Sequence, residues 1–216
     1  MKPLQILYSL LAIAAIVVFP HLGLIPNFGY TIPLLLVVWL VLKQNGEKFS
    51  DIGFRFKPLT LKAVLIGSGA AVAILSIMQG LVFPLLELFV ELEEEDLGLY
   101  DIIRENKIQL LIMIVMGWLI GGFYEEIVFH GFIFTRLEKM IPGQYTTVLS
   151  FVIACLLFGA YHLQMGAAGA FNALVVGMVY QGLFLYFKRD LWASIICHGV
   201  YNTLVMTLIH LGYLLS

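Results

Sequence analysis

Long apolar stretches, separated by short segments with charged residues, make up most of the chain. A helix needs about 20 residues to cross the hydrocarbon core of a bilayer. The pattern therefore predicts an all-α polytopic transmembrane helix bundle. The short segment Leu85–Val90 would add a partial eighth span to seven, so we expect about seven to eight. The seven stretches are Leu4–Phe19, Tyr30–Leu42, Ala63–Leu86, Ile108–Phe134, Thr147–His162, Ala167–Phe187 and Leu191–Leu215.

Composition agrees with a chain that is surrounded by a lipid bilayer. The chain is 61% hydrophobic and 12% charged, whereas a soluble domain is about 25% charged. We therefore expect one integral membrane domain over residues 1–216. The net charge of −2 argues against a nucleic-acid partner. No small-residue cleavage site ends the first apolar stretch, which predicts a retained helix and not a signal peptide.

Basic residues predict the orientation of the bundle. If the spans alternate in direction, all but two of the lysines and arginines lie on one side, and only Arg104 and Lys107 lie on the other. The positive-inside rule then places the N-terminus in the cytoplasm and the C-terminus outside. An acidic cluster falls on the outer side, where we expect a solvated loop or surface helix. Its members are Glu91, Glu93, Glu94, Glu95 and Asp96.

Two adjacent acids interrupt the fourth apolar stretch. Glu125 and Glu126 lie in an otherwise uncharged run from Met113 to His130. One carboxylate at the centre of a bilayer costs ~2.5–3.5 kcal/mol, so a function has to account for the pair. On an α-helix the two side chains point about 100° apart, which predicts two different roles. His130 follows Glu126 by one turn, and we expect it to hydrogen-bond and orient that carboxylate.

Polar residues in two other apolar stretches complete the candidate site. They are His162, and His198 with Asn202 one turn later. Counted from Arg136 and Leu191, Glu125 and His198 lie at depths that let them meet, whereas His162 falls closer to the outer edge unless its helix is tilted or starts later. A carboxylate in a dry pocket can act as general base on water. Imidazoles can hold that water or bind a metal that activates it. Asn202 can donate to an oxyanion. Together these groups favour peptide-bond hydrolysis.

The three motifs resemble those of a known family. Glu125-Glu126-xxx-His130, Phe158-xxx-His162 and His198-xxx-Asn202 are similar to the EExxxR, FxxxH and HxxxN/B motifs of the CPBP family, which comprises the CAAX-processing endopeptidases and bacteriocin-immunity (Abi) membrane proteins. The resemblance covers roughly Gly117 to Thr207.

The resemblance implies a role for each site residue. Glu125 would be the general base and Glu126 its supporting acid. His162 would position the water, and His198 and Asn202 would stabilise the oxyanion. Phe158 and His130 would support these groups without contacting the substrate, which would be a peptide or a membrane protein. The short chain resembles bacterial members, which implies a prokaryotic plasma membrane.

One position departs from the family pattern, because His130 stands where the family has arginine. Histidine can be neutral and cannot form the two-pronged pair that arginine makes with a carboxylate. Three interpretations stay open: a weakened enzyme, a catalytically silent scaffold or immunity protein, and a site with three histidines, in which His130 joins His162 and His198 as ligands of a divalent metal such as zinc. A proton-coupled transporter is a further alternative, but the first three spans supply almost no polar residues for a path. The oligomeric state stays open as well.

Overall fold

The computed structural model describes residues 1–25, 29–57, 59–88, 102–104 and 106–213, and these residues contain helices and no strand. The acidic cluster at 91–96 lies outside the described residues. The helices, in chain order, are α1 (Pro3–Val18), η1 (Phe19–Leu22), α2 (Thr31–Gln44), η2 (Phe49–Ile52), α3 (Leu61–Ile77), η3 (Met78–Val82), α4 (Phe83–Glu87), α6 (Lys107–Met116), η4 (Gly117–Ile133), α7 (Phe134–Met140), α8 (Thr146–Tyr161), η5 (Leu163–Met165), α9 (Gly166–Tyr186) and α10 (Trp192–His210).

Each of the seven predicted stretches contains a helix. Among the described residues, five helices are long and apolar enough to cross a membrane, and α2 and α8 are shorter apolar helices. The five are Pro3–Leu22, Leu61–Glu87, Lys107–Met140, Leu163–Tyr186 and Trp192–His210. The described part of Leu85–Val90 ends the helix Leu61–Glu87 and does not start a separate span. The all-helical membrane fold is thus confirmed.

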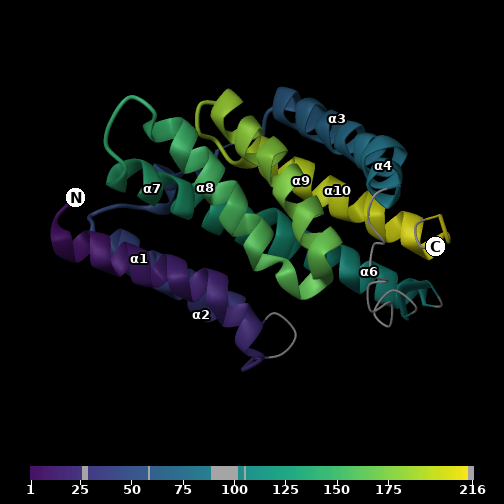
Figure 1. Cartoon of the computed structure of the whole chain (residues 1–216), viewed down its shortest axis with the longest axis horizontal. Coiled ribbons are helices and arrows are strands. Elements are labelled where there is room, and N and C mark those ends of the chain that lie inside the picture. Colours follow the sequence, from purple (N-terminus) through teal and green to yellow (C-terminus); the bar gives the residue numbers. More distant parts are fainter. Residues whose placement is uncertain (26–28, 58, 89–101, 105, 214–216) are drawn as a thin grey trace.

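The helix α10 occupies the centre of the bundle. It packs against α3 on one side and against η4 and α9 on the other. Figure 1 shows α1 and α2 together on the flank opposite α3, with α7, α8, α9 and α10 between them. The hairpin of α1 and α2 reaches the centre through contacts of α2 with η4 and of α1 with α8.

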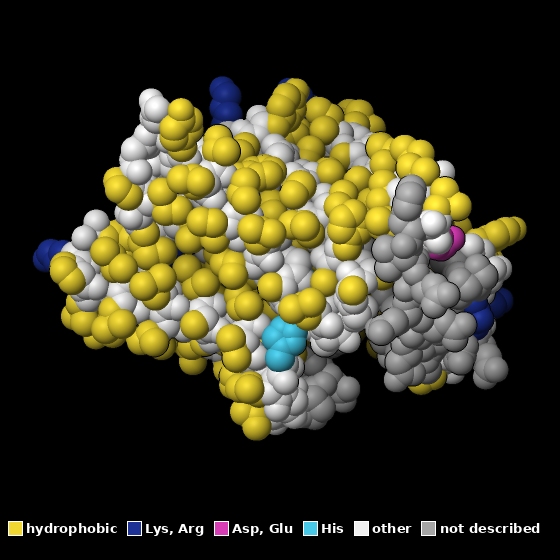
Figure 2. Space-filling view, in the orientation of Figure 1, with side chains coloured by type: hydrophobic (Ala, Val, Ile, Leu, Met, Phe, Trp, Pro, Cys, Tyr) yellow, Lys and Arg dark blue, Asp and Glu magenta, His cyan; other side chains and the backbone are white. Residues whose placement is uncertain are grey.

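Apolar side chains cover the outside of the bundle. Figure 2 shows them spread across the face in view, with lysine and arginine side chains at its margins. Leu65 is 62% exposed and Val148 is 61% exposed, although both lie within apolar helices. In contrast Glu126, His130 and Arg136 are fully buried. An apolar exterior around a polar interior is what a lipid solvent selects.

The candidate acids lie on a π-helix, not on the α-helix that the sequence predicts. The segment η4 continues α6 without a break and bonds each residue to the fifth one before it. Helices with π geometry are rare in proteins, and those that occur are often located at functional sites. Most of η4 is buried, and its glycines bring its backbone close to α10. A π-helix has more residues in each turn than an α-helix, so successive side chains are separated by less than the 100° assumed for Glu125 and Glu126.

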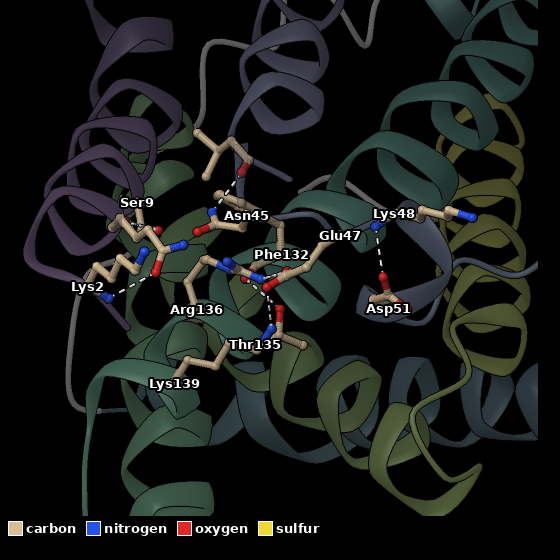
Figure 3. A network of polar contacts seen from close by, with 12 residues as sticks. Lys2, Ser9, Asn45, Glu47, Lys48, Asp51, Phe132, Thr135, Arg136 and Lys139 are labelled. Atoms are coloured by element: carbon tan, nitrogen blue, oxygen red, sulfur yellow. Dashed lines mark hydrogen bonds and ion pairs between the residues drawn. The ribbon is translucent and has the colours of Figure 1, made fainter. Parts of the chain in front are cut away.

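Ion pairs join the loops at one end of the bundle. Glu47 follows α2 and pairs with Arg136 and with Lys139 of α7, the latter at 2.7 Å. Figure 3 shows the Arg136 side chain directed toward Glu47. At the same end, Glu138 pairs with Arg189. Lys57 Nζ lies 2.6 Å from Asp190 Oδ2. These contacts tie the segment between α2 and α3, the helix α7 and the segment after α9 together.

We expect Glu47→Ala to lower the free energy of unfolding by about 3–5 kcal/mol, because it leaves the fully buried Arg136 without its carboxylate. The measurement is thermal unfolding in detergent micelles. The double variant Glu47→Ala/Arg136→Met should recover most of the loss.

Glu138→Ala is the matched control, since its partner Arg189 is half exposed and stays hydrated when unpaired. We expect this change to cost less than about 1 kcal/mol. Equal losses in the two single variants would contradict a special role for the buried arginine.

Candidate functional site

The two acids of η4 face different neighbours. Glu126 is fully buried, and its Oε1 lies 2.8 Å from Nδ1 of His198 on α10. Glu125 is 6% exposed. Its Oε2 lies 3.7 Å from His162 Nε2 and 3.8 Å from His198 Nε2. These two distances exceed a hydrogen bond, and polar atoms at such a separation are commonly bridged by water.

His162 is held by its own helix. It is the C-cap residue of α8, and its Nδ1 lies 2.8 Å from the carbonyl oxygen of Phe158. A carbonyl only accepts, so Nδ1 carries the proton that it donates. In the neutral ring the lone pair is then on Nε2, which is the atom nearest Glu125.

The depth of His162 agrees with that of Glu125, which counting from Arg136 did not predict. Arg136 does not mark the edge of the bundle, because it is fully buried and paired with Glu47. The helix continues to Met140, and α8 starts at Thr146. Counted from these two ends, Glu125 and His162 are similarly deep.

His130 does not form the expected hydrogen bond with Glu126. Its Nε2 lies 3.8 Å from Glu126 Oε1, which is too long. Its Nδ1 instead lies 2.9 Å from Oε1 of Gln181 on α9. The imidazole stands beside Glu126 but is oriented by a neutral amide. Nothing in the spacing of Gln181 along α9 predicted this role.

The ring of Phe158 touches all three histidines of the site. Its centroid lies 4.6 Å from that of His162, 5.3 Å from His130 and 6.1 Å from His198. Gly177 of α9 makes room for it, because a Cβ there would lie 2.7 Å from Phe158 Cδ1. By packing against all three imidazoles, Phe158 helps to fix the distances between them. On the other side, Tyr180 stacks on His198 at 4.5 Å.

Asn202 lies beside His198 and does not bond either acid. Its Nδ2 donates to the carbonyl oxygen of Gly117 at 3.2 Å. Its Nδ2 and His198 Nε2 both face Gly121, where a Cβ would lie 2.8 Å from that nitrogen and still closer to the amide. Gly121 therefore keeps open the space where η4 meets the two polar side chains of α10.

The residues present do not fit a metal centre. Within the described ranges, no group of three or more histidine, cysteine, aspartate or glutamate side chains is arranged to hold a metal ion. His130 is turned toward Gln181 and takes no part with His162 and His198.

A protein-family model matches part of the chain. Residues 107–204 match the model for type II CAAX prenyl endopeptidase Rce1-like proteins. We call this part of the chain the Rce1-like segment, because it is similar to that family. It contains all five residues expected at the site, from Glu125 to Asn202, and it confirms the resemblance carried by the motifs. The Rce1-like family is a protease family of CAAX type. Searches of curated proteins and of solved structures gave no match.

We expect Gly121→Ala to destabilise the Rce1-like segment by about 1–3 kcal/mol, because the added methyl group overpacks the contact with His198 and Asn202. Thermal unfolding measures the effect. Gly69→Ala on α3 is the matched control, since a Cβ there meets nothing within 4 Å. A Gly121→Ala protein as stable as the control would contradict the close contact.

Proposed function

We propose that the protein is an intramembrane endopeptidase that hydrolyses a peptide bond with a water activated by Glu125. One observation carries the proposal. A single carboxylate oxygen, Glu125 Oε2, lies within 4 Å of the Nε2 atoms of two histidines from different helices. A water between these atoms has a base beside it, and His162 Nε2 can accept its second hydrogen.

Glu125 and His162 act on the attacking water. His162 donates Nδ1–H to the Phe158 carbonyl, so its Nε2 can accept a hydrogen bond from the water. Glu125 takes the other proton as the water oxygen attacks the carbonyl carbon. When the carbon–nitrogen bond breaks, that proton passes to the leaving amine. The products are a carboxylic acid and an amine, and Glu125 is again a carboxylate.

Two hydrogen-bond donors on α10, Asn202 and His198, can stabilise the oxyanion that forms when the water attacks. Asn202 uses one amide hydrogen on the Gly117 carbonyl and has a second one to donate. When Glu126 carries a proton, it can donate that proton to His198 Nδ1, and the imidazole proton then lies on Nε2. Both donors lie beside Gly121, on the side of Glu125 that faces α10.

The arrangement favours a peptidase over a transporter. In the described residues before α6, Ser9 and the hydroxyl of Tyr30 are the buried polar side-chain groups. A transport path would need polar groups through both halves of the bundle. We propose further that the shorter helices α2 and α8 also cross the bilayer, which gives seven spans. The substrate is a peptide or membrane protein, and the family description suggests a prenylated CAAX sequence.

Glu125→Gln should abolish cleavage and leave the fold intact, because glutamine keeps the shape of the side chain but cannot take a proton from water. The assay uses proteoliposomes and a quenched-fluorescent peptide ending in a CAAX sequence, farnesylated and unfarnesylated. The unfolding temperature is measured in parallel.

Turnover of either peptide by the wild-type protein, and none by Glu125→Gln, would support the proposal. Equal cleavage by both proteins would remove Glu125 as base. A folded wild-type protein that cleaves neither peptide would favour the silent scaffold. A rate that requires the farnesyl group would identify the lipid as part of the substrate.

We expect the N-terminus in the cytoplasm, because the basic residues joined by ion pairs gather at the end formed by the segment between α2 and α3, the helix α7 and the segment after α9. Reporter fusions after Ser50 and after Lys107 measure this. Ser50 should be cytoplasmic and Lys107 external, and the opposite pattern would reverse the assignment.

A further inference from the structure

Buried polar side chains of α9, η4 and α10 form a line of contacts that starts at Gln181. The Oε1 atom of Gln181 lies 2.9 Å from His130 Nδ1. On the other side of the ring, His130 Nε2 lies 3.8 Å from Glu126 Oε1, and the same oxygen lies 2.8 Å from His198 Nδ1. Gln181, His130 and Glu126 are fully buried, and His198 is 5% exposed. The line therefore crosses three helical segments inside the bundle.

The first hydrogen bond of this line has a fixed direction. The Oε1 atom of Gln181 is a carbonyl oxygen and only accepts, so His130 Nδ1 carries the hydrogen and donates it. The neutral imidazole then has a lone pair on Nε2. This nitrogen is buried and has no hydrogen-bond partner in the part of the chain that the structure describes. Gln181 thus makes the ring present a lone pair, and not a hydrogen, to Glu126.

That lone pair affects the hydrogen bond between Glu126 and His198. If Glu126 Oε1 carried no hydrogen, one of its own lone pairs would face His130 Nε2, which is unfavourable in a dry interior. A hydrogen on Oε1 removes this conflict and is donated to His198 Nδ1. His198 then carries its own hydrogen on Nε2, the atom that lies 3.8 Å from Glu125 Oε2. The amide at one end of the line thus controls the donor at the other end.

The packing around the line keeps its rings in place. Tyr180 precedes Gln181 on α9, and its ring lies 4.5 Å from that of His198 and 5.9 Å from that of His130. The hydroxyl of Ser194 on α10 donates to the Tyr180 carbonyl oxygen at 2.9 Å. The two helices are therefore joined at the residue before Gln181, which holds the amide at a fixed position relative to both imidazoles.

We propose that Gln181 is a positioning residue whose side-chain oxygen selects the protonated nitrogen of His130 and, through Glu126, that of His198. The proposed reaction needs the second selection, because His198 Nε2 can stabilise an oxyanion only if it carries a hydrogen. The inference rests on the proposed peptidase function, since it explains how one donor of that reaction is held ready.

Gln181→Met tests the proposal, because methionine is unbranched like glutamine and its sulfur is only a weak acceptor. We expect both tautomers to reverse. His130 would donate from Nε2 to Glu126 Oε1, and His198 would donate to the same oxygen from Nδ1. The hydrogen of Glu126 would move to Oε2, which is buried without a partner among the described residues.

The measurement is solid-state NMR of protein with 15N-labelled histidine, in proteoliposomes without substrate. Protonated and bare ring nitrogens differ in their 15N chemical shifts, so the spectrum reports each tautomer directly. His130→Gln and His198→Gln assign the two signals, because each variant removes one of them. In the wild-type protein we expect hydrogen on Nδ1 of His130 and on Nε2 of His198.

The same change should lower kcat about 100-fold with the CAAX peptides, as for one lost oxyanion donor. We expect an unchanged KM, because the lost interaction is made only in the transition state. Ser194→Ala is the matched control. It removes another buried hydrogen bond between α9 and α10, but one that ends on a backbone carbonyl. This variant should lose stability and keep the wild-type tautomers and kcat.

The wild-type spectrum alone can overturn the inference, since hydrogen on Nε2 of His130 or on Nδ1 of His198 would contradict it. Wild-type tautomers in Gln181→Met would overturn it as well, and so would reversed tautomers with unchanged kcat. The spectra need no cleavage, so they separate this inference from the proposed function. Reversed tautomers in Gln181→Met, together with no cleavage by the wild-type protein, would support the control of both rings by Gln181 and remove the peptidase.

Discussion

The structure depends on the burial of two neighbouring carboxyl groups in a bundle whose exterior is apolar. Glu126 has no exposure, and among the described residues it has one hydrogen-bond partner, His198, which comes from another helix. Helix α10 must therefore lie close to η4. Small residues allow this, because Gly121 of η4 faces His198 and Gly199 of α10 lies against the ring of Trp118. The Trp118 Nε1 also donates to Thr203 at 3.0 Å. The hydrogen bond of that carboxyl group joins α10 to η4 inside the bundle.

The spacing of the site then follows from a single aromatic ring. Phe158 contacts the imidazoles of His130, His162 and His198, which come from three different helical segments. A shift of α8 by a fraction of an ångström would move all three at once, because packed interiors transmit strain. The aromatic residue of the FxxxH motif therefore does more than fill space. It makes the geometry around Glu125 a shared property of α8, α10 and η4.

The sequence predicted the spans and the polar residues but not the local geometry. Apolar length is a local property, so each of the seven stretches contained a helix. Acids in hydrocarbon are rare, so Glu125 and Glu126 stood out. The π-helix was missed because it arises from close packing against α10, which no periodicity encodes. The partner of His130 was missed because Gln181 is a neutral amide 51 positions away. The depth of His162 was misjudged because Arg136, assumed to mark the edge, is buried by its pair with Glu47.

The hairpin of α1 and α2 lies outside the Rce1-like segment and nevertheless contributes to its interior. Glu47 supplies the counter-charge of Arg136, and Tyr30 supplies the hydroxyl that bonds Tyr161. The boundary of the family match is thus not a boundary in the packing. A chimera that exchanged residues 107–204 for those of another family member would inherit a new helical core against an old hairpin. Such a chimera would have to carry matching residues at positions 30 and 47 to keep both contacts.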